Sequence, residues 1–240
     1  MNNRNIMRSA SSTGISIIIP TLNEEEGICA LLEHLLSASG NQENIEIIVC
    51  DAGTDRTEEK ASRYPVTLLR TAKGRARQMN AGAALAKNPI LYFLHADTFP
   101  PASFATDIRN AVEKGHSAGC FQMMFDDPDP MMAIYGWCTR LPFPLCRGGD
   151  QSLFITEELF RKIGGFDETM QVMEDIEIIS RIEKEASFRI LEKVVVTSAR
   201  KYRTNGIIRL QMIFGTIHLL YALGADQETL VRYYRENIMP

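Results

Sequence analysis

Four apolar segments of strand length alternate with helix-like segments in the first hundred residues, and this alternation restricts the possible folds more than any other feature of the sequence. The strand-like segments are residues 15–19, 45–50, 66–69 and 90–94. The first two are rich in isoleucine and valine without regular polar alternation, which is typical of strands buried on both faces of a parallel sheet. The order predicts an α/β fold with an open, mostly parallel central sheet and helices on both faces.

Helices are predicted between these strands and throughout the second half. Residues 23–37 carry apolar side chains at helical spacing, with Asn23 as the predicted N-cap and three glutamates in the first turn. Further helices are predicted at residues 54–62, 74–87, 100–114, 156–163, 174–184, 206–223 and 226–235, strands at 118–125 and 194–197, and an irregular insertion at 126–147.

The domain count follows from the absence of repeats and linkers. The polar residues 1–14 are predicted to form a flexible tail, and residues 15–240 a single domain that ends with C-terminal helices at 206–236. The net charge of −4 argues against a nucleic-acid partner. Five cysteines without a CxxC pair, and an N-terminus without an apolar signal sequence, favour a reducing, cytoplasmic location.

Polar residues follow each of the four predicted strands, where open α/β sheets bind ligands. They are Pro20, Asn23 and Glu24 after the first strand, Asp51 and Gly53 after the second, Lys73, Gly74 and Arg75 after the third, and His95 and Asp97 after the fourth. Helix caps and turns are the alternative explanation for several of them. Cations at a helix start oppose the helix dipole, so Lys73 and Arg75 make more sense if an anionic diphosphate binds there.

The segment His95-Ala96-Asp97 follows a run that should be buried. A carboxylate at that place needs a partner, and a divalent cation such as Mg²⁺ or Mn²⁺ would supply one. The alternative is that Asp97 caps the next helix. Glu174 and Asp175 form a second acidic site, which fits either a simple dipole complement at a helix start or a general base.

Five segments together resemble family-2-type GT-A glycosyltransferases, and most closely a bacterial subgroup of small, stand-alone enzymes. They are SIIIPTLNEE, EIIVCDAGTDRT, KGRARQMNAGAALA, ILYFLHADTFPP and GGFDETMQVMEDIEIISRI, in the order and at the spacing of that family. The resemblance implies a Rossmann-like GT-A fold and transfer of a sugar from a UDP- or GDP-linked donor to an acceptor hydroxyl, with inversion and with a divalent metal.

The resemblance also implies roles for individual residues. It assigns nucleotide-sugar binding to Pro20, Asn23, Glu24, Asp51, Gly53, Lys73, Gly74, Arg75, Asn80, Asp97 and Gln151. It makes Asp175 the catalytic base with Glu174 beside it, and His95 and Asp97 the metal site for Mn²⁺ or Mg²⁺. Two departures matter: His95 replaces the first acid of the family's DxD motif, and no QxxRW motif is present. The second predicts a single transfer per encounter.

Two other functions stay open from the sequence. Because His95 replaces a family acid, a non-catalytic nucleotide-sugar-binding or scaffold protein is one alternative. A sugar nucleotidyltransferase is another, disfavoured because Pro20-Thr21-Leu22-Asn23 occupies the place of its glycine-rich loop.

The apolar stretch at residues 206–224 raises the question of membrane contact. It is interrupted by Arg209, Gln211 and His218 and is preceded by a basic stretch. We expect a helix packed on the domain. The alternative is that residues 200–224 touch the inner face of a membrane, which would fit a lipid-linked acceptor.

Overall fold

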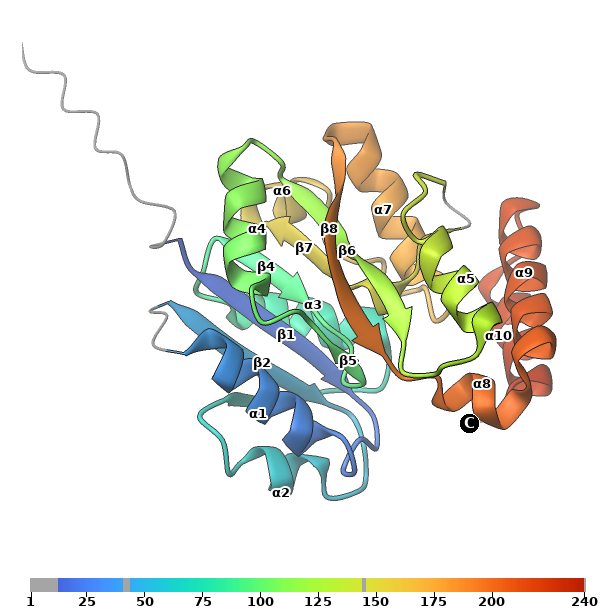
Figure 1. The fold of residues 1–240 in the computed structure, drawn as a ribbon, viewed down its shortest axis with the longest axis horizontal. Helices are drawn as coiled ribbons and strands as arrows, with labels where there is room; N and C mark the ends of the chain where they lie inside the picture. The colour runs from blue at the N-terminus through green and yellow to red at the C-terminus, as the bar shows by residue number, and fades with distance from the viewer. Residues whose placement is uncertain (1–12, 41–43, 144–145, 240) are drawn as a thin grey trace, which may run out of the picture.

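The computed structural model describes residues 13–40, 44–143 and 146–239, and their core is one twisted sheet (Figure 1). Its strand order is β3-β2-β1-β4-β7-β6-β8-β5. The first half of the chain supplies four parallel strands: β1 (Ile15–Thr21), β2 (Ile45–Asp51), β3 (Thr67–Arg70) and β4 (Ile90–Phe93). The four apolar runs therefore do form the predicted parallel strands.

The second half extends the sheet with mixed pairing. The strands are β5 (Thr98–Phe99), β6 (Ala118–Phe125), β7 (Leu153–Thr156) and β8 (Phe188–Thr197). β7 runs antiparallel to both β4 and β6, β8 runs parallel to β6, and β5 runs antiparallel to β8. β5 and β7 were not predicted from the sequence. The two residues of β5 are too few to show any periodicity.

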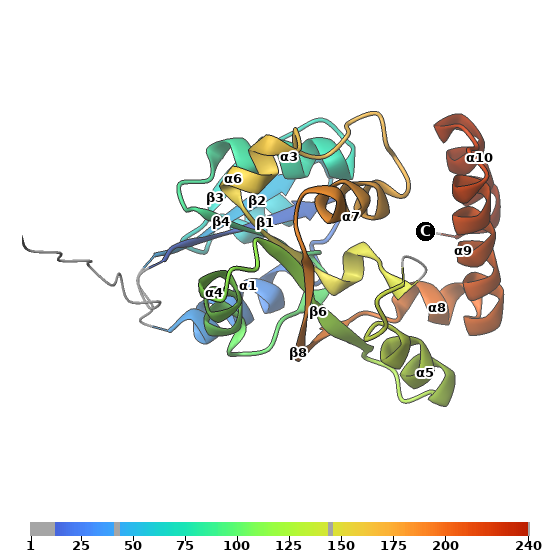
Figure 2. The same cartoon turned by 90° about the horizontal axis from the view of Figure 1, so that it is seen from above.

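Helices cover both faces of the sheet (Figure 2). On one face, α1 (Ile28–Ser39), α2 (Thr57–Ala61) and α4 (Phe104–Glu113) pack into one apolar cluster. On the other, α3 (Arg75–Leu85), α6 (Glu157–Lys162) and α7 (Glu174–Glu185) pack into a second. Of the strands between them, β1, β2 and β4 are largely buried on both sides, as their unbroken apolar runs predict, whereas β3 at the edge of the sheet is partly exposed.

A third apolar cluster lies at one end of the sheet, among the remaining helices (Figure 1). These helices are α5 (Pro130–Cys138), α8 (Arg200–Asn205), α9 (Ile207–Ala222) and α10 (Gln227–Asn237). Leu210, Ile213 and Ile217 of α9 are buried in this cluster, which confirms that the apolar stretch packs on the domain. Within the described residues, no helix combines the length and apolar character needed to cross a bilayer.

The start of α1 differs from the prediction. The helix begins at Ile28, with Gly27 rather than Asn23 at the N-cap, and no acidic residue lies in its first turn. Asn23 has a φ of 58°, in the left-handed region that asparagine tolerates, and its Oδ1 accepts a hydrogen bond from the Thr54 amide at 2.8 Å. A contact between two loops therefore outweighs the local capping preference.

The segment predicted to be irregular contains the helix α5. Asp129 caps it, accepting a hydrogen bond from the Met131 amide at 2.8 Å, and Pro130 occupies the first turn. The Pro and Met content that suggested an insertion is thus compatible with a capped helix. Most of the predicted N-terminal tail lies outside the described residues.

Candidate active site

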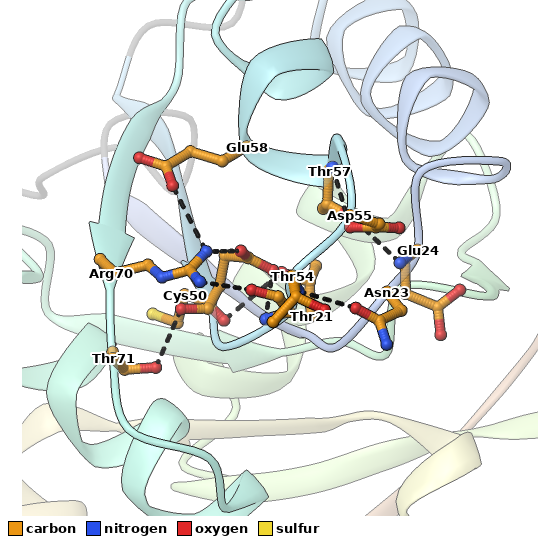
Figure 3. Close-up of polar contacts among 12 residues, drawn as sticks. Thr21, Asn23, Glu24, Cys50, Thr54, Asp55, Thr57, Glu58, Arg70 and Thr71 are labelled. Carbon is orange, nitrogen blue, oxygen red and sulfur yellow. Dashed lines mark hydrogen bonds and ion pairs between the residues drawn. The ribbon is translucent and has the colours of Figure 1, made fainter.

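Thr21, Cys50 and Arg70 lie at the carboxyl ends of β1, β2 and β3 (Figure 3). These strand ends meet around a buried carboxylate, Asp51. Asp51 is only 2% exposed. Its Oδ1 accepts hydrogen bonds from Thr21 Oγ1 at 2.8 Å and from the Gly53 amide at 3.2 Å, while Arg70 Nη1 donates to Oδ2 at 2.6 Å. The buried charge is thus both paired and hydrogen-bonded, as burial requires.

Gln78 of α3 fixes the position of this strand end. Its Nε2 donates to the carbonyl oxygens of Thr21 and Cys50, both at 2.7 Å. One side chain therefore joins the ends of β1 and β2, so the groups around Asp51 sit on a rigid support.

The loops after β1 and β2 are tied together directly. The Glu24 amide donates to Thr57 Oγ1 at 2.9 Å and the Glu25 amide to Asp55 Oδ2 at 3.0 Å. Gly53 lies against this contact so closely that an added Cβ would come within 2.6 Å of the Asn23 backbone nitrogen. Asn23 thus belongs to one preformed loop pair beside Asp51, whereas Pro20 lies within β1, opposite Cys50. A cavity of ≈ 340 Å³ lies on this loop pair, lined by Asn23, Glu25, Glu26, Thr54, Asp55 and Arg200.

Asp97 and Glu24 form an acidic pair near the same edge. Burial raises the pKa of Glu24 above its usual value, Arg200 at 3.3 Å opposes the rise, and the charge of Asp97 adds to it. Within the described residues, the Asp97 carboxylate has no hydrogen bond or salt bridge to protein. An oxygen donor without a protein partner and next to a second acid suits a divalent cation.

The described residues hold no group of three or more His, Cys, Asp or Glu side chains arranged to bind a metal ion. A cation at Asp97 would therefore need ligands from diphosphate oxygens and water as well. Magnesium and manganese are commonly bound in that way, by one or two carboxylates plus substrate phosphates.

An ion pair links the starts of α3 and α7. Arg75 Nη1 lies 2.9 Å from Glu174 Oε1, with Glu174 3% exposed and the Arg75 side chain 43% exposed. Burial raises the pKa of Glu174, and Arg75 opposes that rise. Part of the Arg75 side chain is accessible next to the glycine-led start of α3, where an anion would also meet backbone amides.

Asp175 lies in the first turn of α7 and is held by two backbone amides. Its Oδ1 accepts from the Ile176 amide at 2.9 Å, and its Oδ2 accepts from the Gly149 amide. His95, after β4, hydrogen-bonds through Nδ1 to Asp150 Oδ1 at 2.9 Å, immediately beyond Gly149. The structure thus brings His95 and Asp175 together, although eighty positions separate them in the sequence.

Three further residues were predicted to bind the donor. Two of them hydrogen-bond to the protein backbone, and the third is exposed to solvent. Asn80 bonds to both the amide and the carbonyl of Phe166, each at 2.9 Å. Gln151 is 2% exposed and donates to the carbonyls of Phe121 and Thr139. Lys73 is exposed, next to Gly74.

The sequence did not single out Thr21, Arg70 or Arg200 as site residues. Arg70 had a readable signal, because it directly follows the third apolar run at the edge where ligands bind. A cavity of ≈ 480 Å³ next to it is lined by Leu69, Arg70, Thr71, Ala72, Arg77, Asn80, Ala81, Ala84 and Glu168. Arg200 had no such signal, since only the tertiary fold brings it to Glu24.

The architecture is that of the GT-A glycosyltransferases. The mannosyltransferase PcManGT from Pyrobaculum calidifontis, solved in complex with GDP-Man and Mn²⁺, matches with a TM-score of 0.68 at 19% identity, covering 93% of this chain and 70% of that one. Residues 1–349 of S. aureus TarS match with a TM-score of 0.63 at 18% identity, covering 89% of this chain and 66% of that one. TarS has also been solved with UDP and with UDP-GlcNAc.

The sequence comparisons identify the family. The model for Glycosyl transferase family 2 matches residues 16–164, and the chain belongs to this family. An uncharacterized glycosyltransferase of Haemophilus influenzae is 27% identical over 190 residues, which are 72% of this chain and 63% of that protein. A dolichol-phosphate mannosyltransferase of Pyrococcus furiosus is 30% identical over 107 residues, 42% of this chain and 30% of that one. The chain thus spans less than two thirds of either relative.

Proposed function

We propose that this protein transfers a sugar from a nucleoside-diphosphate sugar, UDP- or GDP-linked, to an acceptor hydroxyl, with inversion and one transfer per encounter. The observation that carries the proposal is the arrangement at the carboxyl edge of the sheet. Asp51 and Asp97 follow two of its parallel strands, and Asp175 is tied to the same edge through Gly149 and the neighbouring His95. Carboxylates in these three places match a donor site next to a general base.

The donor would lie along this edge in a defined direction. Asp51, with Thr21 and Arg70 around it, would take the nucleobase. Arg75 and Lys73, at the start of α3, would face the diphosphate, because a guanidinium and free helix amides together favour an anion. The complexes of related folds with GDP-Man and with UDP-GlcNAc support both bases as candidates.

Asp175 would act as the base. As the acceptor oxygen bonds to the anomeric carbon, its proton passes to the Asp175 carboxylate. The bond from that carbon to the diphosphate oxygen breaks, and the nucleoside diphosphate leaves with the electron pair. A Mn²⁺ or Mg²⁺ ion held by Asp97 would neutralise charge on the diphosphate.

A panel of UDP, GDP, CDP and ADP, each with and without Mn²⁺, tests the donor site by thermal shift. A nucleotide at 100 times its Kd should add about 2.7 kcal/mol, which is several degrees for a chain of this size. We expect a manganese-dependent shift with UDP or GDP that Asp97→Ala abolishes. Asp107→Ala, on α4, is the matched control and should keep the shift. No shift with any nucleotide contradicts the proposal.

A non-catalytic nucleotide-sugar-binding protein is the second candidate, because His95 stands where the family has an acid. The two functions separate in one assay. An enzyme hydrolyses its donor slowly with Mn²⁺ when no acceptor is present, and Asp175→Ala abolishes this. A donor that binds but is neither hydrolysed nor transferred favours the binding protein.

The outer face of α9 suggests that the acceptor is presented at a membrane surface. Ile208, Met212, Leu219 and Leu223 are 59%, 64%, 60% and 75% exposed and follow one another at helical spacing. Residues 200–239 carry six basic and three acidic side chains, whereas the whole chain has a net charge of −4. An apolar helix face in a basic segment suits an anionic lipid surface.

Sedimentation with anionic liposomes at low salt tests this contact. Binding should be lost in the double variant Met212→Glu/Leu219→Glu. Leu85→Glu, an exposed leucine on α3, is the control and should bind like the wild type. Wild-type protein that stays in the supernatant contradicts the membrane contact and leaves the transfer reaction unaffected.

A further inference from the structure

The backbone of Gly149 lies against both the imidazole ring of His95 and the carboxylate of Asp175. A Cβ on Gly149 would lie 2.6 Å from His95 Cε1, 2.7 Å from His95 Nε2 and 3.2 Å from Asp175 Oδ2. Real Cβ atoms essentially never approach other heavy atoms as closely as the two His95 contacts. A side chain at position 149 would therefore collide with the His95 ring, so the ring lies directly against the Gly149 backbone and near the Asp175 carboxylate.

The sheet sets this arrangement. β4 and β7 are antiparallel neighbours with Phe93 opposite Leu153. His95 leaves the end of β4 and Asp150 approaches the start of β7, so the register places the two side chains opposite one another. Their 2.9 Å hydrogen bond then ties the turn at Gly149–Gln151 to the end of β4.

The chemistry of the pair leaves only one direction for this hydrogen bond. The Asp150 side chain is 51% exposed, so its carboxylate is ionised at neutral pH. An ionised carboxylate only accepts, so His95 Nδ1 carries the proton and donates it. The ring orientation is thereby fixed.

We propose that His95 is a positioning residue for Asp175: bonded to Asp150 and packed on Gly149, it holds the Gly149 amide against the Asp175 carboxylate and is not a ligand of the divalent cation. This inference rests on the proposed function of Asp175 as the base. It leaves Asp97 as the metal-binding side chain of the His95-Ala96-Asp97 segment. It also explains why a histidine can occupy a position where an acid would face Asp150 and repel it.

Two amide substitutions test the roles of the two ring nitrogens of His95 separately. In His95→Asn the side-chain amide reaches roughly the place of Nδ1 and keeps a donor for Asp150, while nothing remains at Nε2. In His95→Gln the amide reaches roughly the place of Nε2, the nitrogen left to ligate a metal. His95→Ala removes both, and His116→Asn, at a half-buried site remote from the cluster, is the control.

Donor hydrolysis and Mn²⁺ affinity are measured for each variant, the latter by titrating Mn²⁺ into protein with the nucleotide and following the thermal shift. In His95→Ala we expect kcat to fall about 10- to 100-fold, as for a misplaced catalytic group, with donor KM and Mn²⁺ Kd within about twofold. His95→Asn should recover part of kcat, because it restores the bond to Asp150 but not the packing of the ring on Gly149, and His95→Gln should resemble His95→Ala.

A Mn²⁺ Kd that rises about tenfold in His95→Ala, or recovery by His95→Gln rather than His95→Asn, overturns the proposal. So does an equal loss of kcat in His95→Asn and His95→Ala. Failure of the proposed function is recognised separately, because wild-type protein would then neither hydrolyse nor transfer any donor. The Mn²⁺ titration reads binding alone and decides the ligand question even then.

Discussion

Arg75 at the start of α3 and Glu174 at the start of α7 form an ion pair across 2.9 Å, joining two helices that lie ninety-nine positions apart in the chain. Glu174 is almost fully buried and Arg75 is not. Removing Arg75 should therefore cost more stability than removing Glu174. Without Arg75 the Glu174 carboxylate would be left buried and unpaired, whereas without Glu174 the Arg75 guanidinium would be partly hydrated.

Arg75→Gln should destabilise the protein by about 2 kcal/mol at neutral pH, a value discounted for the exposure of Arg75. Burial already raises the pKa of Glu174, and removing Arg75 raises it further. Glu174 thus has a higher pKa in the folded state than in the unfolded state. Its contribution to the stability of the folded state is complete below the unfolded-state pKa and is lost as the pH rises through the folded-state pKa. The deficit of the variant should thus be small near pH 4.5 and largest at pH 8.

Urea denaturation of the wild type and Arg75→Gln at both pH values measures this difference. Arg77→Gln is the matched control on the same helix, because its partner Glu168 is 3.8 Å away and both side chains are about half exposed. It should change stability by less than about 0.5 kcal/mol at either pH. A deficit for Arg75→Gln that shrinks as the pH rises would contradict the assignment.

Asn80→Ala should destabilise the fold by about 2 kcal/mol without changing nucleotide affinity. The substitution leaves the amide and carbonyl of Phe166, a buried residue, without their partner, and an unpaired buried polar group costs about 1–3 kcal/mol. Chemical denaturation gives the first quantity and nucleotide titration the second. A large loss of nucleotide affinity with unchanged stability would instead support the donor-binding role predicted from the sequence.

Gly53→Ala should destabilise the protein by about 2 kcal/mol and weaken nucleotide binding. Its Cβ would meet the Asn23 backbone nitrogen at 2.6 Å, and backbone cannot move aside as a flexible side chain does.

Gly215→Ala in α9 is the opposite case, since an added Cβ there meets nothing within 4 Å. It should stabilise the helix by about 0.5–1 kcal/mol. Thermal unfolding of both variants with and without nucleotide tests the pair.

Asp175→Asn should lower kcat by about 10²- to 10⁴-fold while the nucleotide-dependent thermal shift persists. The amide keeps the shape of the side chain but cannot take a proton. Asp107→Asn, on the far face of the sheet, is the control for a general loss of acidic charge. An Asp175→Asn variant that turns over like the wild type would exclude Asp175 as the base.

Much of the parallel half of the fold was readable in advance, and so were the residues at its carboxyl edge. Asp51, Asp97 and Arg75 each follow an apolar run, and the rule for ligand sites in open sheets needs nothing else. The start of α1 was not readable. The local sequence favours Asn23 as a helix cap, but in the fold its side chain instead accepts a hydrogen bond from the Thr54 amide of a distant loop. The contact of Asn80 with the Phe166 backbone was not readable either, because it lies outside any local pattern, and a role of Asn80 in donor binding stays a prediction.

The sequence by itself determined the family, the succession of the four parallel strands along the chain and the sheet edge at which we propose the site, because burial on both faces leaves an unbroken apolar run in the chain. The tertiary structure decided which groups meet at that edge: Arg70 with Asp51, Arg200 with Glu24, and His95 with Asp150 beside Asp175. These contacts depend on strand register and on the packing of helices that lie far apart in the sequence. Such contacts leave no periodicity for a single sequence to display.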